Sequence, residues 1–560
     1  MHTLTGIGVS PGIVAGPAAV MNAPPVLPAR PPAVTDEHAA VEAAHTALGE
    51  VAAELLERAG QAIPPAADIL AAQSAMAADP VLAQRVAELI KAGRPPAYAV
   101  SDVIAEFAEQ FQAAGGYLAE RAADLEDLRN RIVARLLGLP MPGLPDPGHP
   151  YVLIADDLAP ADTATIDPRQ VLAIVTERGG PTSHTAILAK SLGLPAVVAC
   201  TGAIAVADGT QLLVNGTIGT AVVAPAPSQV RSALDREAVR RAAAARVTGP
   251  GRTSDGHPVK LMANLGTARE LPAATAAEGV GLLRTEFLYL DRAEAPGFDE
   301  QRAAYAEIFD AFAGRRVVVR TLDAGADKPL RFATQPDEPN PALGVRGLRT
   351  SLRSPELLDE QLAAISAAAQ RARAEVWVMA PMVSTPGEAA AFAQRARAQG
   401  LPTVGVMIEV PAAALRADAV LAGCDFVSLG TNDLAQYAFA ADRTLSDVAD
   451  LLDPWQPALL DLIHLTAQAG HRAGKPVGVC GEAAGDALLA LVLVGLGVTS
   501  LSMAPATLVD VRAALAHHTI AECRHLADLA RAAPDAAAAR SHVEAVAHTG
   551  RWGGARDGWR

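Results

Sequence analysis

The stretch VLAIVTERGGPTSHTAILAK, residues 171–190, passes from an apolar run through a glycine turn into a helical pattern. The run Val171–Val175 predicts a buried strand, and the two glycines predict the turn after it. His184 is therefore expected where a loop enters a helix. Thr182 or Ser183 can cap that helix, and its unpaired N–H groups and dipole favour an anion beside the imidazole. A capping turn with an ordinary exposed histidine is the alternative that these residues alone leave open.

Length and composition limit the classes of protein to which the chain can belong. At 560 residues, 51% of them hydrophobic, the chain predicts several domains with large cores. A formal net charge of −15 argues against a nucleic-acid partner. The four cysteines are widely separated and form no CxxC pair, so neither a disulfide framework nor a zinc site is indicated, and a reducing cytoplasm is expected. No signal peptide and no membrane-spanning segment are predicted.

The first half of the chain reads as a domain with an insertion. Residues 4–20 predict one or two short strands, and the nearest sheet for them to join is the one that contains the 171–175 strand. The segment between has a helical pattern from Thr35, with further runs at about 66–92, 97–114 and 116–138. Four helices with short connectors predict a bundle, and the residues alone favour a purely structural spacer.

The second half alternates strand and helix patterns. Residues 228–246, charged and rich in alanine, predict a connecting helix. Eight strand candidates follow: Val259–Asn264, Gly279–Thr285, Val317–Leu322, Val376–Pro381, Thr403–Val410, Phe426–Gly430, Pro476–Cys480 and Ser500–Met503. Eight βα units predict a TIM barrel, whose active site lies at the C-terminal ends of its strands.

Ionisable residues cluster at those predicted strand ends. They are Arg284, Glu286, Arg320, Asp323, Lys328, Glu409, Asp433, Arg443 and Glu482. Each alone is consistent with a salt bridge at the barrel rim, but together on one face they indicate a site. The cations suit phosphate and carboxylate oxygens, while Glu409 and Asp433 are hard oxygen ligands suited to Mg²⁺. Cys480, at the end of the seventh strand, is either a packed thiol or a proton donor.

Several motifs carry a family resemblance. GGPTSHTAILAKSLGLPAVV (179–198) resembles the phosphohistidine motif of the phosphoenolpyruvate-utilising enzymes, most closely that of enzyme I of the bacterial sugar phosphotransferase system. The barrel motifs that resemble the same family are GVGLLRTEFL (279–288), VVVRTLDAGADKPL (317–330), NPALGVRGLR (340–349), VGVMIEVPAA (404–413), SLGTNDLAQYAFAADR (428–443) and GVCGEAAGD (478–486). The resemblance runs over nearly the whole chain except roughly its last fifteen residues.

The resemblance implies roles for individual residues. His184 would take a phosphoryl group from phosphoenolpyruvate and pass it to the carrier protein HPr, with Thr163 bonded to its ring, and Cys480 would protonate the enolate. The implied phosphoenolpyruvate ligands are Arg284, Arg320, Lys328, Arg346, Asn432 and Arg443, and the implied Mg²⁺ ligands are Glu409 and Asp433. The resemblance also implies a homodimer formed through the barrel. Two departures from the family pattern are the segment Ala71–Pro80, where an acidic, histidine-containing helix is usual, and Ala326 in place of a glycine.

The resulting hypothesis is a multidomain α/β protein. A swivelling phosphohistidine domain (1–20 and 146–226) carries an inserted helical HPr-binding domain (21–145), and a linker helix (227–250) leads to a TIM barrel (251–545) and a disordered tail (546–560). A pyruvate phosphate dikinase or phosphoenolpyruvate synthase is the alternative enzyme, although no ATP-binding domain or glycine-rich phosphate loop precedes His184. A non-catalytic HPr-binding regulator is the alternative from another class, and the presence of every expected ligand argues against it.

Overall fold

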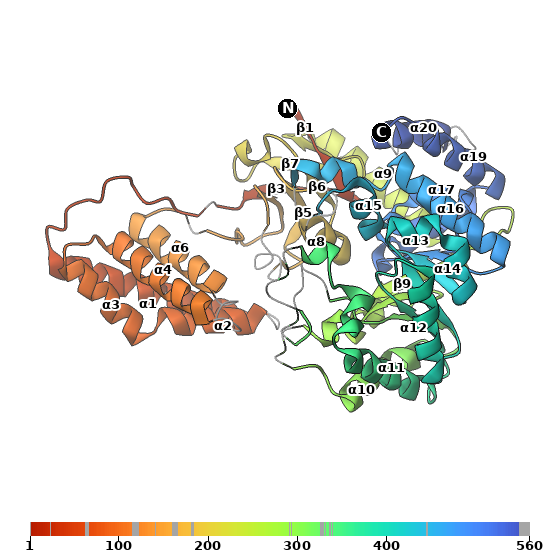
Figure 1. The fold of residues 1–560 in the computed structure, drawn as a ribbon. Coiled ribbons are helices and arrows are strands. Elements are labelled where there is room, and N and C mark those ends of the chain that lie inside the picture. Colours follow the sequence, from red (N-terminus) through yellow and green to blue (C-terminus); the bar gives the residue numbers. More distant parts are fainter. Residues whose placement is uncertain are drawn as a thin grey trace. The chain divides into compact units, whose positions relative to one another are not determined.

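A computed structural model describes the chain except residues 1, 23, 62–65, 115–121, 141, 159–165, 181–183, 291, 293, 325–329, 331, 335–337, 339, 444–445 and 548–560. The described residues form two compact units, one mainly of residues up to Val230 and the other mainly of residues from Arg231 onward (Figure 1).

The first unit contains an eight-stranded sheet with the order β1-β8-β7-β3-β4-β5-β6-β2. Its strands are β1 (His2–Thr5), β2 (Ile7–Ser10), β3 (Ile13–Val20), β4 (Tyr151–Ala155), β5 (Val171–Thr176), β6 (Ala196–Val198), β7 (Gln211–Asn215) and β8 (Thr220–Val223). The pairing of Ala19 in β3 with Leu153 in β4, in parallel, confirms that the N-terminal residues join a sheet completed after the insertion.

The N-terminal segment forms three strands rather than the one or two expected. Gly6 separates β1, which pairs with β8, from β2, which pairs with β6 at the other end of the strand order. A Cβ at Gly6 would lie 2.5 Å from the carbonyl oxygen of Val198, so the chain passes too close to another backbone there for any side chain. The sequence pattern does not reveal this crossing because it depends on pairing with strands that lie about two hundred residues further along the chain.

The turn that opens the chain's central motif has the predicted form. Gly179 adopts a left-handed φ of 95°, and α8 (His184–Leu192) starts at His184, so the expected loop-to-helix junction is confirmed. Thr163, Thr182 and Ser183 lie outside the described residues, as does the side chain of His184.

The inserted segment is helical, as expected. Its described helices are α1 (Glu37–Gln61), α2 (Ala66–Ala77), α3 (Pro80–Lys91), α4 (Pro96–Ala114) and α6 (Ala122–Leu137), which Figure 1 shows as one cluster. They bury a shared apolar core that includes Leu48, Val86 and Leu128. The expected continuous run at 66–92 was wrong: the Asp79 carboxylate accepts the N–H of Val81 at 2.7 Å and Pro80 starts a new helix, so the segment is two helices.

The connecting helix α9 (Pro227–Ala245) confirms the helix predicted at 228–246. Its C-terminal half belongs to the second unit, where Arg240 donates to Asp510 of α18 (Leu508–His517) at 2.8 Å. Glu237 accepts from Arg240 and Arg241 on the same helix. This half of α9 is therefore bound to the barrel by a charged cluster.

The second unit is a closed parallel barrel in which all eight predicted strands are found. They are β9 (Lys260–Leu265), β10 (Gly279–Arg284), β11 (Arg316–Arg320), β12 (Glu375–Ala380), β13 (Val404–Ile408), β14 (Phe426–Leu429), β15 (Val477–Val479) and β16 (Ser500–Met503). The pairing of β16 with β9, with Ser502 opposite Met262, closes the barrel. Alternation along each strand sends one set of residues outward to the helices and the other into the interior.

Helices cover the outside of the barrel (Figure 1). They are α10 (Phe298–Ala311), α11 (Pro355–Ala369), α12 (Pro386–Ala398), α13 (Pro411–Leu415), α14 (Ala417–Gly423), α15 (Thr431–Phe439), α16 (Pro457–Ala473), α17 (Ala487–Gly495), α18, α19 (Ile520–Arg531) and α20 (Ala536–Ala547). The interior holds a smaller apolar cluster that includes Val318, Trp377 and Phe426. Within the described part of the chain, no helix combines the length and apolar character needed to span a bilayer. The tail expected to be disordered starts at residue 546, but residues 546 and 547 are the last two of α20. Residues 548–560 lie outside the described residues.

Candidate active site

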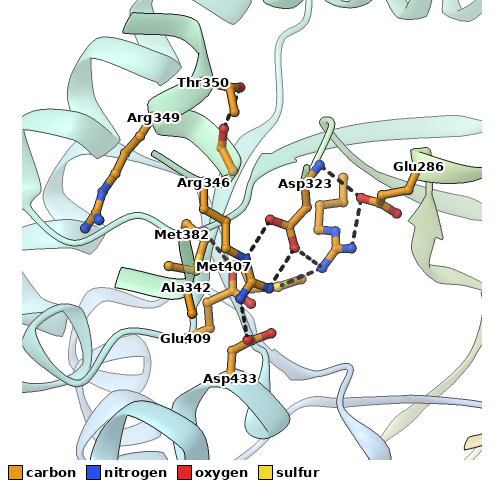
Figure 2. A network of polar contacts seen from close by, with 12 residues as sticks. Glu286, Asp323, Ala342, Arg346, Arg349, Thr350, Met382, Met407, Glu409 and Asp433 are labelled. Carbon is orange, nitrogen blue, oxygen red and sulfur yellow. Dashed lines mark hydrogen bonds and ion pairs between the residues drawn. The ribbon is translucent and has the colours of Figure 1, made fainter. Parts of the chain in front are cut away.

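A buried network of arginines and carboxylates lies at the C-terminal ends of the barrel strands (Figure 2). Arg320, the last residue of β11, contacts Glu286 at 2.9 Å through Nη2 and Asp323 at 3.4 Å through Nη1. Arg346 contacts both oxygens of Asp323 at 3.4 Å and Oδ1 of Asp433 at 3.0 Å. Asp323 therefore lies between two guanidinium groups, and the second of them reaches on to Asp433.

The electrostatics keep this network ionised. Burial lowers the pKa of Arg320, but the negative charges of Glu286 and Asp323 together raise it by more. The pKa of Arg320 therefore lies above the ordinary value. The pKa of Arg346 is raised in the same way by Asp323 and Asp433. Burial raises the pKa of Asp323, yet Arg320 and Arg346 lower it below its usual range. Both arginines therefore stay positively charged, and their ion pairs hold the guanidinium groups in one orientation before a ligand binds.

Glu409 is the least compensated carboxylate of the site. It follows β13, is 1% exposed, and accepts the backbone N–H of Met382 at 2.6 Å. Burial, and after it the charge of Asp433, raises the pKa of Glu409 to about 8. A Cβ at Gly430 would lie 2.7 Å from its other oxygen, so the glycine leaves room beside that carboxylate.

These two carboxylates fit a hard divalent cation. Glu409 and Asp433 come from the ends of the neighbouring strands β13 and β14, and an added positive charge would offset the repulsion that raises the pKa of Glu409. Among the described residues no group of three or more His, Cys, Asp or Glu side chains is arranged to hold a metal. A pair of carboxylates is compatible with a cation such as Mg²⁺, which binds one or two carboxylates and completes its shell with water and substrate oxygens.

The other expected ligands lie around this network. Arg443 approaches Asp433 at 3.7 Å, and the Asn432 side chain accepts the N–H of Glu482 at 3.3 Å. Arg284 ends β10 with its guanidinium 5.2 Å from the centre of the Phe287 ring. Lys328 lies outside the described residues, as does the departure at Ala326.

Cys480 follows β15 and lies in the barrel interior, 4% exposed. Its thiol contacts the Leu429 carbonyl at 3.5 Å. Burial raises the pKa of Cys480 to about 11, which outweighs the opposing effects of Ser428 and Arg320. The thiol therefore keeps its proton at neutral pH, as a proton donor requires.

Two contributors to the site, Tyr437 and Met382, were not expected, and two carboxylates, Glu286 and Asp323, were expected as members of the strand-end cluster but were given no individual role. Glu286 and Asp323 follow β10 and β11, so the strand-end position that pointed to Arg320 also pointed to them. Tyr437 lies 3.4 Å from Arg346. Met382 supplies a backbone N–H from a left-handed conformation with φ 59°, and no feature of the sequence marks it. Taken together, the fixed cations, the carboxylate pair and the protonated thiol suit a small, highly charged substrate that needs one proton at carbon.

The chain matches three parts of one enzyme family. Residues 240–520 match the PEP-binding domain of the PEP-utilising enzymes, residues 5–121 their N-terminal part, and residues 147–219 their mobile domain. A solution structure of Enzyme I is 33% identical and covers 42% of this chain and 99% of its own, but its TM-score of 0.36 is too low for a comparison of folds.

Three named relatives are similar over most of their length. A phosphoenolpyruvate-protein phosphotransferase of Streptomyces coelicolor is 53% identical and covers 97% of this chain and 99% of its own. The phosphoenolpyruvate-protein phosphotransferase of Haloferax volcanii is 43% identical and covers 80% of this chain and 82% of its own length. That of Bacillus subtilis is 35% identical and covers 91% of this chain and 94% of its own length. The chain therefore belongs to the PEP-utilising enzymes and, within them, to the phosphoenolpyruvate-protein phosphotransferase family.

Proposed function

We propose that this enzyme transfers the phosphoryl group of phosphoenolpyruvate first to His184 and then to a histidine of HPr, as the first step of sugar uptake by a phosphotransferase system. Phosphoenolpyruvate binds at the strand ends of the barrel, where Arg284, Arg320, Arg346, Asn432 and Arg443 surround its phosphate and carboxylate, together with Lys328. Arginine suits both groups because its planar fork pairs with two oxygens at once.

The chemistry needs one bond to phosphorus broken, one bond to phosphorus formed and two protons moved. The unprotonated imidazole nitrogen of His184 attacks phosphorus in line, the bond from phosphorus to the enol oxygen breaks, and the phosphorylated ring releases the proton of its other nitrogen to water. The enolate left behind takes a proton at carbon from the thiol of Cys480, and pyruvate results. Thr163 orients the imidazole through a hydrogen bond.

Glu409 and Asp433 would hold Mg²⁺, which supplies positive charge beside the transferring phosphoryl oxygens when it is bound. The network of Arg320, Asp323 and Arg346 keeps the cationic donors in place, so they need no reorganisation as charge develops. The single observation that carries this proposal is the pair of buried guanidinium groups fixed on Asp323 at the active end of the barrel.

The second transfer takes place on another domain. The helical segment at 21–145 would bind HPr, and the phosphorylated domain at 1–20 and 146–226 would move between HPr and the barrel domain at 251–545. Since Arg240 ties the C-terminal half of α9 to Asp510, the movement is assigned to the chain before Arg231 rather than to the whole linker at 227–250. We place the enzyme in the cytoplasm, as a homodimer formed through its barrels.

The test is incubation with ³²P-labelled phosphoenolpyruvate and Mg²⁺, with and without HPr. Acid-labile label is expected on the wild type, absent from His184→Ala, and transferred to HPr when HPr is added. Cys480→Ala is expected to form pyruvate much more slowly. Label that persists in His184→Ala would assign the phosphoryl group to another acceptor, and label that never reaches HPr would contradict the second transfer.

A further inference from the structure

The strand β11 ends at the residues that carry the active-site charges, and side chains hold its backbone there. The regular pairing of β11 with β12 stops at Arg320, opposite Met379. The next three N–H groups donate to the Met379 carbonyl from Thr321 at 2.9 Å, to Oε1 of Gln361 from Leu322 at 2.8 Å, and to Oε1 of Glu286 from Asp323 at 3.1 Å. Side-chain acceptors thus replace the strand ladder at Leu322 and Asp323.

Gln361 is an unusual residue for its place in the fold. It lies on α11, in the layer of helices around the barrel, and is 1% exposed. Its neighbours on the same helix face, Leu358 and Ile365, belong to the main apolar core. An amide without partners is costly in such a core, whereas an apolar side chain of similar size would pack there without that requirement. The amide therefore indicates a task beyond packing.

The hydrogen bonds of Gln361 converge on the end of β11. Its Oε1 accepts the N–H of Leu322, and its Nε2 donates to Oγ1 of Thr285 at 3.1 Å and to the hydroxyl of Tyr305 at 3.2 Å. The Thr285 hydroxyl in turn donates to the carbonyl of Arg320 at 3.0 Å. A hydroxyl has one proton to give, so Thr285 can hold this carbonyl and still accept from the amide. One side chain therefore fixes the backbone on both sides of Thr321.

We propose that Gln361, acting with Thr285, is a positioning residue for Arg320. The amide holds the N–H of Leu322 directly and the carbonyl of Arg320 through the threonine hydroxyl, so the backbone between them keeps one conformation. Because the arginine side chain starts from this backbone, a turn of the peptide would swing its guanidinium away from Glu286 and from the substrate. The inference rests on the proposed function, in which Arg320 binds phosphoenolpyruvate, and Gln361 itself never touches the substrate.

A second buried glutamine offers a matched control. Gln301 on α10 is 2% exposed and also makes three side-chain hydrogen bonds, since it accepts from the hydroxyls of Tyr289 at 2.8 Å and Tyr305 at 3.3 Å and donates to the Pro296 carbonyl at 2.8 Å. None of these three bonds reaches residues 320–323. Gln301→Met and Gln361→Met therefore remove equal numbers of buried bonds, but only the second releases the end of β11.

The first test compares activity with stability. Steady-state release of pyruvate, with full-length enzyme, Mg²⁺ and saturating HPr, is measured on wild type, Gln361→Met, Gln301→Met, Thr285→Val and Thr285→Ser. Gln361→Met and Thr285→Val are each expected to lose about 10- to 100-fold in kcat/KM for phosphoenolpyruvate, as a small displacement of a substrate-binding group does. Gln301→Met is expected to keep the wild-type kcat/KM although denaturant unfolding shows a comparable loss of stability. Thr285→Ser keeps the hydroxyl and is expected to keep the activity.

The second test asks whether the effect passes through Arg320. In an Arg320→Lys background Gln361→Met is expected to cause little further loss, because a lysine ammonium lacks the rigid fork whose direction the backbone sets. Equal losses in the wild-type and Arg320→Lys backgrounds would overturn the positioning role, as would equal kcat/KM values in Gln361→Met and Gln301→Met.

Two further outcomes keep the inference separate from folding and from the proposed function. If Gln361→Met does not fold, the pair Thr285→Val and Thr285→Ser decides, and equal activity in these two variants would overturn the positioning role. A wild type that releases no pyruvate from phosphoenolpyruvate, or an Arg320→Lys variant with full activity, would instead contradict the proposed function itself.

Discussion

The backbone N–H of Met382 donates to Oε1 of Glu409 at 2.6 Å. Met382 holds this position with a left-handed φ of 59°, a conformation that costs a non-glycine residue about 1 to 3 kcal/mol. The bond fixes one oxygen of the carboxylate, while Gly430 leaves space beside the other oxygen. Backbone strain at the end of β12 thus orients the proposed metal ligand at the end of β13.

Glu409→Gln should weaken divalent-cation binding. The amide oxygen can still accept from Met382, but the negative charge is lost, so affinity for Mn²⁺ as a probe of the Mg²⁺ site should fall at least about tenfold. Titration followed by electron paramagnetic resonance measures this affinity. Glu544→Gln, which removes an ion pair with Arg540 on α20, serves as the control. Equal Mn²⁺ affinity in wild type and Glu409→Gln would remove Glu409 from the metal site.

The stability of the metal-free enzyme should depend on pH through the same group. The pKa of Glu409 is raised from an ordinary value of 4.5 to about 8 in the folded state. Between these values the folded protein holds a proton that the unfolded chain has released, so the free energy of unfolding should fall as pH rises from 4.5 to 8. Thermal unfolding in a chelator should show this loss in wild type and a smaller one in Glu409→Gln. Parallel curves for the two proteins would argue against the raised pKa.

Asp323→Asn should impair catalysis without unfolding the barrel. The amide removes the charge that holds Arg320 and Arg346 together, so both guanidinium groups should lose their fixed direction. The expected loss in kcat/KM for phosphoenolpyruvate is about 10- to 100-fold, as for other groups that orient ligands. Steady-state assays of pyruvate release measure it. Asp359→Asn, which breaks an ion pair with Arg395 on the barrel's outer helices, is the matched control and should retain full activity.

Lys475→Met should destabilise the barrel. The Lys475 ammonium donates to the carbonyls of Leu421 at 2.6 Å and Cys424 at 2.7 Å, at the end of α14. Loss of these charge-assisted bonds should lower the free energy of unfolding by about 1 to 3 kcal/mol. Denaturant unfolding of Lys475→Met is compared with Lys260→Met, which removes only an exposed ion pair with Glu278. A Lys475→Met variant no less stable than Lys260→Met would show that the two carbonyls need no cation.

Arg240→Gln should loosen the linker helix α9. Loss of its bonds to Asp510 and Glu237 should raise hydrogen–deuterium exchange in residues 231–245 about fivefold, which corresponds to about 1 kcal/mol. Arg231→Gln, an exposed position of the same helix, is the control. Unchanged exchange in Arg240→Gln would place the anchoring of α9 elsewhere.

Local patterns were enough to predict the elements that position the chemistry. The eight barrel strands and the helix that starts at His184 follow from apolar periodicity and from glycine and proline breaks, which are properties of neighbouring residues. The strand-end positions of Arg320, Glu409 and Cys480 follow as well, because parallel strands present their C-terminal ends on one face. Where individual residues set a helix boundary, as Asp79 and Pro80 do, the same reasoning predicted one helix in place of two.

The sequence motifs also predicted a set of site residues, but tertiary structure decided which of them meet. Arg346 contacts Asp433, and the N–H of Met382 reaches Glu409. Each of these depends on the register between different strands and on the path of the loops after them, and a shift of one residue would turn each strand's side chains to the other face. Sequence therefore determined the fold class and the residues at the strand ends, whereas closure of the barrel determined the network that these residues form.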